Sequence, residues 1–249
     1  APLITEAAKA GKHIFCEKPI ALDLAKIDAA LGTVKQHKVK LQVGFNRRFD
    51  ANFKGVRDVV QKGGIGEPRI LRITSRDPAP PPLEYVKNSG GIFLDMTIHD
   101  FDMARFLMGS EVVEVYATGN VLVDKAIGDV GDIDTALITL RFDNGAMGCI
   151  DNCRQAVYGY DQRVEVFGSK GMVDTGNNTA NRAVVSDASG VHGALPLYFF
   201  LERYMDAYAA ELQAFVDAIQ KDEPTPVTGN DGRAPVLIGL AALKSLKEN

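Results

Sequence analysis

The hydrophobic and polar positions of this chain follow two rhythms, and the change between them lies near residue 47. In the first part, amphipathic stretches alternate with short apolar runs, which predicts helices over 1–8 and 24–37 and strands over 12–16 and 39–45. Pro2 suits a first helical turn, and Asp23 suits an N-cap. Because helix and strand alternate, we expect parallel strands that form the end of a doubly wound α/β sheet.

Residues 48–249 carry a different pattern, in which strands dominate. A helix near 52–62 precedes strands that the alternation predicts over 69–76, 112–123, 135–142, 146–155, 163–167 and 171–174. Asp143, Asn144 and Gly145 give a strong hairpin signal between two of these strands. Two further helices are expected near 200–221 and 234–247. The pattern predicts an α+β domain whose mostly antiparallel, open sheet has helices on one face.

One helix predicted within residues 90–107 is apolar nearly all the way round, which is typical of a buried helix. At about 100° per residue, Asp95, His99 and Asp102 fall on it within an arc of about 60°. Burying two carboxylates and an imidazole is costly unless they are paired or line a polar cavity. The stripe is therefore either a satisfied structural network or an active site.

The active-site interpretation gives each residue of the stripe a chemical task. At i, i+4 spacing Asp95 can hydrogen-bond to the ring of His99 and fix its tautomer. A carboxylate favours the imidazolium and burial opposes it, so His99 could titrate near neutrality and act as a general base in alcohol oxidation. The alternatives are a satisfied core histidine and a metal site at Asp95, His99 and Asp102. The sequence shows no further His or Cys ligand set, which disfavours the metal.

Polar residues also follow predicted strand ends, where ligands bind in open α/β sheets. Glu17, Lys18 and Pro19 come directly after the first strand, and residues 46–50, with two arginines, follow the second. The segment 158–161 follows a later strand and can offer phenol groups to a polyol pocket. Surface turns fit the first two segments about as well, and aromatic residues that pack in a loop fit segment 158–161 nearly as well. Position alone therefore leaves both interpretations open.

Composition narrows the classes of function. The chain has 249 residues, of which 46% are hydrophobic and 24% charged, and its net charge of −4 disfavours a nucleic-acid or anionic-membrane surface. No apolar run reaches the roughly 18 residues of a membrane span. Three cysteines fit a reducing cytoplasm better than a disulfide framework. The chain opens without Met on a predicted helix that is followed by a strand, so the sequence is expected to begin inside a βα unit. No GxGxxG turn occurs, so it lacks its own phosphate-binding fingerprint.

Five segments together carry a family pattern: 17–19 (EKP), 44–50 (GFNRRFD), 75–78 (SRDP), 90–102 (GGIFLDMTIHDFD) and 157–168 (VYGYDQRVEVFG). With these segments the chain resembles the glucose-fructose oxidoreductase / inositol dehydrogenase (Gfo/Idh/MocA) family over essentially its whole length. The EKP tripeptide marks only the broad family, whereas the other motifs are more specific. The resemblance implies the C-terminal part of a dinucleotide-binding Rossmann domain over 1–47 and an α+β substrate-binding and oligomerisation domain over 48–249. Relatives carry a further half-domain upstream, with the glycine-rich turn.

The resemblance also implies roles for individual residues. It implies a catalytic set of Lys18, Asp95 and His99, in which His99 is the acid/base, Asp95 orients it, and Lys18 donates to the substrate hydroxyl. It places polyol contacts at Arg48, Asp77, Asp102, Tyr158 and Tyr160, and cofactor contacts at Glu17, Lys18 and Pro19, with no metal. Asp77 stands where some relatives carry Asn.

The activity that the resemblance implies is hydride transfer to NAD from a ring hydroxyl of myo-inositol, or of a similar cyclic polyol or sugar, giving the 2-keto inositol. It also implies a homotetramer packed through open sheet faces. Three alternatives remain open at this point. One is a scyllo-inositol or aldose dehydrogenase of the same family. The second is a non-catalytic fragment that binds a polyol without turnover, and the third is a metal-dependent hydrolase or isomerase.

Overall fold

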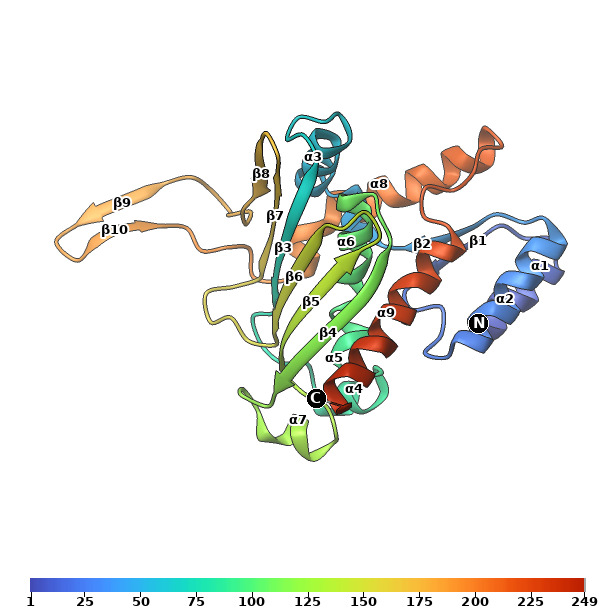
Figure 1. The fold of residues 1–249 in the computed structure, drawn as a ribbon, viewed down its shortest axis with the longest axis horizontal. Helices are drawn as coiled ribbons and strands as arrows, with labels where there is room; N and C mark the ends of the chain where they lie inside the picture. The colour runs from blue at the N-terminus through green and yellow to red at the C-terminus, as the bar shows by residue number, and fades with distance from the viewer. Residues whose placement is uncertain (249) are drawn as a thin grey trace.

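The computed structural model describes residues 1–248. Its N-terminal unit contains two parallel strands, β1 (Ile14–Glu17) and β2 (Leu41–Gly44), with Glu17 opposite Gly44. Helices α1 (Pro2–Lys9) and α2 (Leu24–His37) lie side by side at one end of the molecule (Figure 1). Asp23 caps α2, because its Oδ1 accepts the N–H of Lys26 at 2.9 Å. The predicted element order, cap and parallel pairing are confirmed.

The second part is built on a six-stranded sheet in the order β4-β5-β6-β3-β7-β8. Its strands are β3 (Pro68–Arg76), β4 (Val112–Asn120), β5 (Thr135–Phe142), β6 (Met147–Cys153), β7 (Asp161–Gly168) and β8 (Gly171–Thr175). Only the β3–β6 pair of this sheet is parallel. The predicted hairpin turn lies between β5 and β6, where Gly145 adopts a positive φ of 84°. The mostly antiparallel sheet is confirmed.

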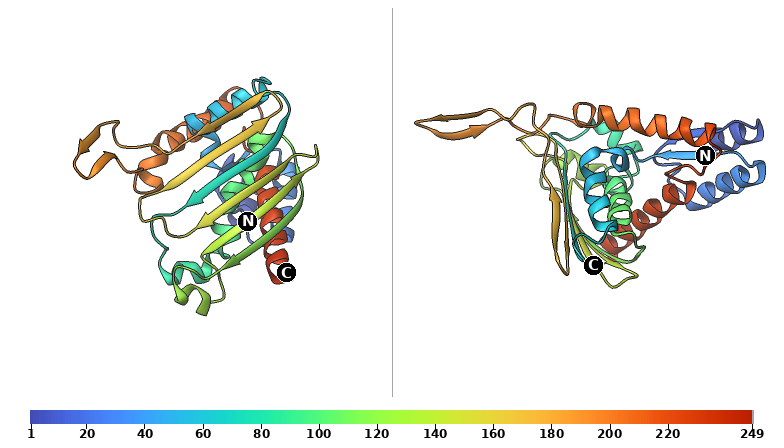
Figure 2. Two further views of the ribbon diagram at one scale, coloured as in Figure 1. Left: turned by 60° about the vertical axis from the view of Figure 1, so that its left-hand side comes forward. Right: turned by 90° about the horizontal axis from the view of Figure 1, so that it is seen from above.

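Helices cover one face of this sheet and leave the other face without a helical layer (Figure 2). The covering helices are α3 (Ala51–Gln61), α6 (Ile98–Met108) and α9 (Gly229–Glu248). Helix α8 (Phe200–Gln220) starts beside the 3₁₀ helix η1 (Asn46–Phe49) and runs along the N-terminal unit, where Phe215 packs on Phe15 (Figure 2). Apolar side chains of the sheet and these helices form the main core, which includes Phe53, Leu71, Phe101, Ile138 and Val166. Within residues 1–248, none of the helices is long and apolar enough to cross a membrane.

A second core joins the N-terminal unit to the rest of the chain. Ile27 and Val43 pack there with Ile98 of α6 and with Val227 and Val236 near the start of α9. The backbone also closes across this junction, since the N–H of Val43 donates to the carbonyl of Val227 at 3.1 Å. The end of the chain therefore holds β2 in place.

The prediction of one continuous helix within residues 90–107 is wrong. The chain forms α5 (Ile92–Asp95) and then α6, with a break at Met96 and Thr97. The N–H of Thr97 donates to the carbonyl of Ile92, five residues earlier, at 2.9 Å, and the Thr97 hydroxyl bonds to Asn152 Oδ1 at 2.5 Å. This wider turn interrupts the regular α-helical ladder, so Asp95 and His99 no longer share one helical stripe.

Short elements without a long periodic pattern were not predicted. They are α4 (Leu83–Asn88), α7 (Lys125–Asp129), β9 (Val184–Asp187), β10 (Gly190–Gly193) and the 3₁₀ helix η1 (Asn46–Phe49). The β9–β10 hairpin projects away from the sheet (Figure 1). Helix α9 begins five residues before its predicted start, because Thr228 and Asp231 bond reciprocally through side chain and backbone as in a capping box.

Candidate functional site

A cavity of about 410 Å³ lies at the carboxyl ends of β1 and β2, where ligands bind in open α/β sheets. Its volume is within the roughly 300–1,000 Å³ that is common for small-molecule sites. Its polar lining comes from both parts of the chain: Glu17, Lys18, Asn46, Arg47, Asp77, Tyr85, Asp95, His99, Arg154 and Tyr160. Phe199, Phe200, Tyr204 and Tyr208 of the α8 region close it with aromatic rings.

Asp95 accepts hydrogen bonds from three residues that line this cavity, Lys18, Tyr85 and Arg154. Its Oδ1 accepts from the Tyr85 hydroxyl at 2.7 Å, and its Oδ2 accepts from both Nη atoms of the buried Arg154 at 3.3 Å. Lys18 Nζ donates to the Asp95 backbone carbonyl at 2.7 Å and lies 3.6 Å from Oδ1. Asp95 therefore fixes the ammonium group of Lys18 at the cavity wall.

His99 is buried beside these groups, but it does not pair with Asp95. Its Nδ1 has no partner among residues 1–248, and its ring packs edge-on against Phe45, with centroids 6.0 Å apart. The predicted Asp95–His99 hydrogen bond is therefore wrong, because the break at Thr97 separates the two and Tyr85 and Arg154 occupy the carboxylate. Burial, followed by the positive charges of Lys18 and Arg47, lowers the pKa of His99 well below 6.5. At neutral pH the ring is neutral and can accept a proton.

Burial also shifts the pKa of Lys18, Asp77 and Tyr160. It lowers the pKa of Lys18 from 10.5, and the Asp95 carboxylate opposes this shift. It raises the pKa of Asp77 to about 6, although Arg154 and Arg47 favour the carboxylate. Burial raises the pKa of Tyr160 well above 10, so its hydroxyl stays protonated. The cavity therefore combines a neutral base with several hydrogen-bond donors.

Arg47 and not Arg48 lines this cavity. Arg47 Nη1 lies 2.6 Å from Asp100 Oδ1, and its Nη2 donates to the Tyr160 hydroxyl at 3.4 Å. The sequence reasoning missed Arg47 because two adjacent arginines gave no means to choose between them. It also missed Tyr85 and Arg154, which lie outside any motif and reach the cavity only through the tertiary fold.

Five of the predicted catalytic and polyol-binding residues meet in the cavity: Lys18, Asp77, Asp95, His99 and Tyr160. Arg48 of η1 and Asp102 of α6 do not line it, and they pair with each other outside the cavity. Tyr158 also lies outside it and donates to Asp161 at 2.6 Å. These placements argue against direct polyol contacts from Arg48, Asp102 and Tyr158.

Glu17 and Lys18, at the end of β1, present polar groups to the cavity. The Lys18 ammonium has three N–H donors, of which one bonds to the Asp95 carbonyl and the others lie at the cavity wall. Gly44 allows the Glu17 side chain to lie across the end of β2, since a Cβ there would be 2.6 Å from Glu17 Oε2. Within residues 1–248, no group of three or more His, Cys, Asp or Glu side chains is arranged to hold a metal ion.

Comparison with known protein families matches two parts of the chain. Residues 53–174 match the GFO/IDH/MocA C-terminal domain, and residues 1–45 match the NAD-binding Rossmann fold of an oxidoreductase family. The match to the Rossmann fold ends two residues before the predicted boundary at residue 47.

Individual relatives match almost the whole chain. Myo-inositol 2-dehydrogenase from Thermotoga maritima is 57% identical over 246 residues, which cover 99% of this chain and 74% of the relative. Inositol 2-dehydrogenase from Rhizobium meliloti is 51% identical, covering 100% of this chain and 75% of the relative. A crystal structure of scyllo-inositol dehydrogenase from Lactobacillus casei with bound NAD(H) and scyllo-inositol has a TM-score of 0.92 at 33% identity, covering 100% and 75% of the two chains. The chain thus spans about three quarters of these relatives' length.

Proposed function

The chain belongs to the Gfo/Idh/MocA oxidoreductase family, and from this premise we propose that it oxidises a ring hydroxyl of myo-inositol to the ketone, with NAD⁺ as the acceptor. The observation that carries the proposal is a single cavity that places a neutral, buried His99 with Lys18 and Asp95. A neutral imidazole is the state in which histidine can take a proton from an alcohol.

The reaction removes a proton from the hydroxyl oxygen and a hydride from its carbon. His99 takes the proton, and Lys18 donates a hydrogen bond to the same oxygen, which stabilises the negative charge that develops there. Asp95 holds Lys18 in this place through its backbone carbonyl at 2.7 Å. When bound, NAD⁺ supplies the acceptor for the hydride.

The remaining polar groups of the cavity suit a ligand with many hydroxyls. Arg47 and Tyr160 offer donors, and Asp77 offers an acceptor whose pKa of about 6 leaves it mostly ionised at neutral pH. Glu17, Lys18 and Pro19 at the end of β1 would hold the nicotinamide end of the cofactor. The 249 residues contain no GxGxxG turn for the pyrophosphate.

The test is NADH formation by the protein with NAD⁺ and, in separate reactions, myo-inositol, scyllo-inositol or glucose. We expect the highest kcat/KM with myo-inositol and a loss of about 10²–10⁴-fold on His99→Asn substitution. His37→Asn, on the exposed side of α2, is the matched control and should keep full activity. Absence of NADH with every polyol would refute the proposal. A higher kcat/KM with scyllo-inositol or glucose would refute myo-inositol as the substrate and assign the preferred compound instead. Activity should survive a chelator.

We propose further that the protein forms a homotetramer through the uncovered sheet face. Met147, Ile70, Phe167 and Met172 lie in one cross-strand row on that face, and three of them are exposed apolar side chains. Large exposed apolar patches commonly mark association surfaces. Light scattering should give the mass of a tetramer, and Phe167→Arg should reduce this mass.

All three cysteines are free thiols, which supports a cytoplasmic location.

A further inference from the structure

Two adjacent arginines of η1 hold two carboxylates of α6, the helix that carries His99. Arg47 Nη1 lies 2.6 Å from Asp100 Oδ1. Arg48 binds Asp102 through two parallel hydrogen bonds, from Nε at 2.8 Å and from Nη2 at 2.6 Å. The Asp102 side chain is only 1% exposed, so this bidentate pair is shielded from water. Asp100 is the next residue after His99, and Asp102 lies three residues, or about one turn, after His99, so both pairs act on the His99 end of α6.

The same segment is joined to the strand that carries Lys18. η1 follows β2 directly, and β2 pairs with β1 through Gly44 and Glu17, the residue before Lys18. Phe45, between β2 and η1, packs against the ring of His99. One path from Lys18 to His99 therefore runs through β1, β2 and η1, in addition to the bond from Lys18 Nζ to the backbone carbonyl of Asp95. Along this path, the placement of Lys18 relative to His99 depends on how η1 is held on α6.

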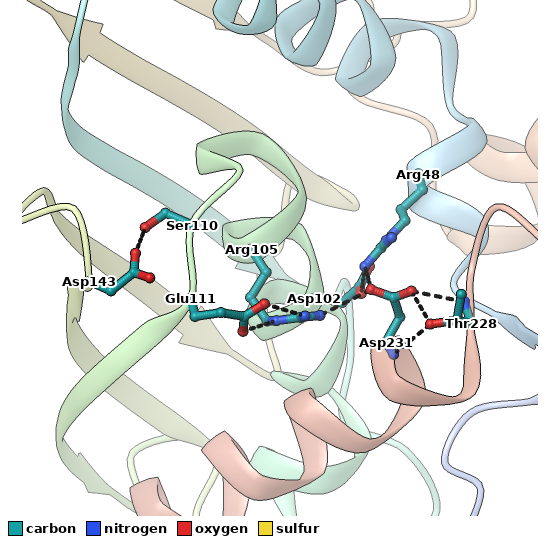
Figure 3. A network of polar contacts seen from close by, with 8 residues as sticks. All are labelled: Arg48, Asp102, Arg105, Ser110, Glu111, Asp143, Thr228 and Asp231. Carbon is teal, nitrogen blue, oxygen red and sulfur yellow. Dashed lines mark hydrogen bonds and ion pairs between the residues drawn. The ribbon is translucent and has the colours of Figure 1, made fainter. Parts of the chain in front are cut away.

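A third element completes this arrangement (Figure 3). Asp231, in the first turn of α9, accepts from Arg48 Nη2 at 3.0 Å and from Arg105 Nη1 of α6 at 3.3 Å through the same oxygen. Its other oxygen accepts from the backbone and hydroxyl of Thr228 at 2.8 and 2.7 Å. Neither Arg48, Asp102 nor Asp231 lines the catalytic cavity. Their charged groups bond to one another, and Arg48 and Asp231 also line a separate cavity of about 390 Å³.

We infer that Arg48, Asp102 and Asp231 are positioning residues, which set His99 against Lys18 by tying η1, α6 and the start of α9 together. Their catalytic meaning rests on the proposed function. A bidentate guanidinium–carboxylate pair restrains direction as well as distance, which a single hydrophobic contact does not do. A displacement of about 1 Å at a catalytic group can lower the rate by roughly 10²-fold.

The test compares Arg48→Met with Asp102→Asn in the full protein. We expect kcat to fall at least about 10-fold in both, with KM for the polyol within about 2-fold, because neither side chain touches the substrate cavity. Arg48→Lys, which keeps the charge, should recover part of kcat. Glu114→Gln is the control, because it removes an exposed ion pair with Arg141 on β4 and β5 and should leave kcat unchanged. If the first two variants do not fold, kcat and KM of Asp231→Asn are compared with those of the wild-type protein instead, because the Asp231 side chain is less buried.

The pKa of His99, measured by NMR, separates positioning from a direct charge effect. The sequence has only 4 histidines, so the resonance can be assigned by substitution. Direct electrostatics predicts opposite shifts, because one variant removes a cation and the other an anion. Displacement of His99 towards water predicts a rise in both variants, towards 6.5.

Three results would overturn the inference: a raised KM with unchanged kcat, opposite pKa shifts, or lower thermal stability with kcat and the His99 pKa unchanged. If the wild-type protein oxidises no polyol but the His99 pKa still rises in both variants, the proposed function fails and the positioning role stands.

Discussion

Glu211 of α8 is a buried carboxyl group for which the structure predicts a strong dependence of stability on pH. Its side chain is fully buried, and neither carboxyl oxygen has a hydrogen-bond partner among residues 1–248. The neighbouring Gln42 donates to the Glu211 backbone carbonyl at 2.8 Å and not to its carboxyl group. Burial, with smaller effects from Glu17 and Asp102, raises the pKa of Glu211 from 4.5 to about 8. The folded protein therefore holds a proton there that the unfolded chain releases.

The sign and size of the effect follow from this difference in pKa. Between pH 4.5 and about 8 the native state binds more protons at Glu211 than the unfolded state does, so stability falls as pH rises through this range. The slope is about 1.4 kcal/mol per pH unit, and the loss reaches about 3 kcal/mol at pH 7 and about 5 kcal/mol above pH 8. Glu211→Gln removes the proton equilibrium and with it this loss.

The assay is urea unfolding of wild type and Glu211→Gln at several pH values from 5.5 to 8.5. Groups common to both proteins cancel in the difference in unfolding free energy, which should grow in favour of the variant by about 1.4 kcal/mol per pH unit and level off above pH 8. Asp206→Asn, on the exposed side of the same helix, is the control and should show no such trend. A difference that stays constant within about 0.5 kcal/mol over this range would refute the reasoning.

Three further predictions follow from other parts of the molecule. Gly168→Ala should lower the free energy of unfolding in urea by about 1–3 kcal/mol, because its Cβ would lie 2.4 Å from the Ile65 carbonyl oxygen. Gly32→Ala in α2, where the new Cβ meets open space, should raise the free energy of unfolding by about 0.5–1 kcal/mol. Asp50→Ala should cost about 3–5 kcal/mol and lower the melting temperature, because it removes the N-cap of α3 and leaves the buried Arg203 without its ion-pair partner. The acid limb of the kcat/KM profile should lie below pH 6.5, because burial lowers the pKa of His99, and a limb at or above pH 7 would contradict this assignment.

The sequence predicted the long elements well, because their patterns are local. The Asp23 cap, the alternation in β5 and the Asn144–Gly145 turn each follow from neighbouring residues, and the structure confirms them. The break at Thr97 could not be predicted in this way. It depends on Asn152, which lies in a strand that comes beside Thr97 only in the folded chain.

The sequence predicted Lys18 and His99 of the site, but not all of the residues around them. Lys18 and His99 stood out because a strand end and a buried imidazole are local signals. Arg47 and Arg48 share one motif, yet only the first lines the cavity, since adjacent residues of η1 point to different sides. Arg154 is buried by contacts with Asp95 and Asp132, which come from other parts of the chain. Residues of this kind are found only from the tertiary structure.

The junction at β2 has a consequence for how the protein folds. The carbonyl of Leu41 accepts the hydroxyl of Thr225 at 2.7 Å, across a sequence separation of 184 residues. Contacts of such separation form slowly, because the loop-closure entropy must be overcome first. The bonds from β2 to Thr225 and Val227 can therefore form only after residue 227 has been synthesised. In pulsed hydrogen exchange during refolding, we expect the amide of Val43 to be protected later than those of the central strands of the six-stranded sheet.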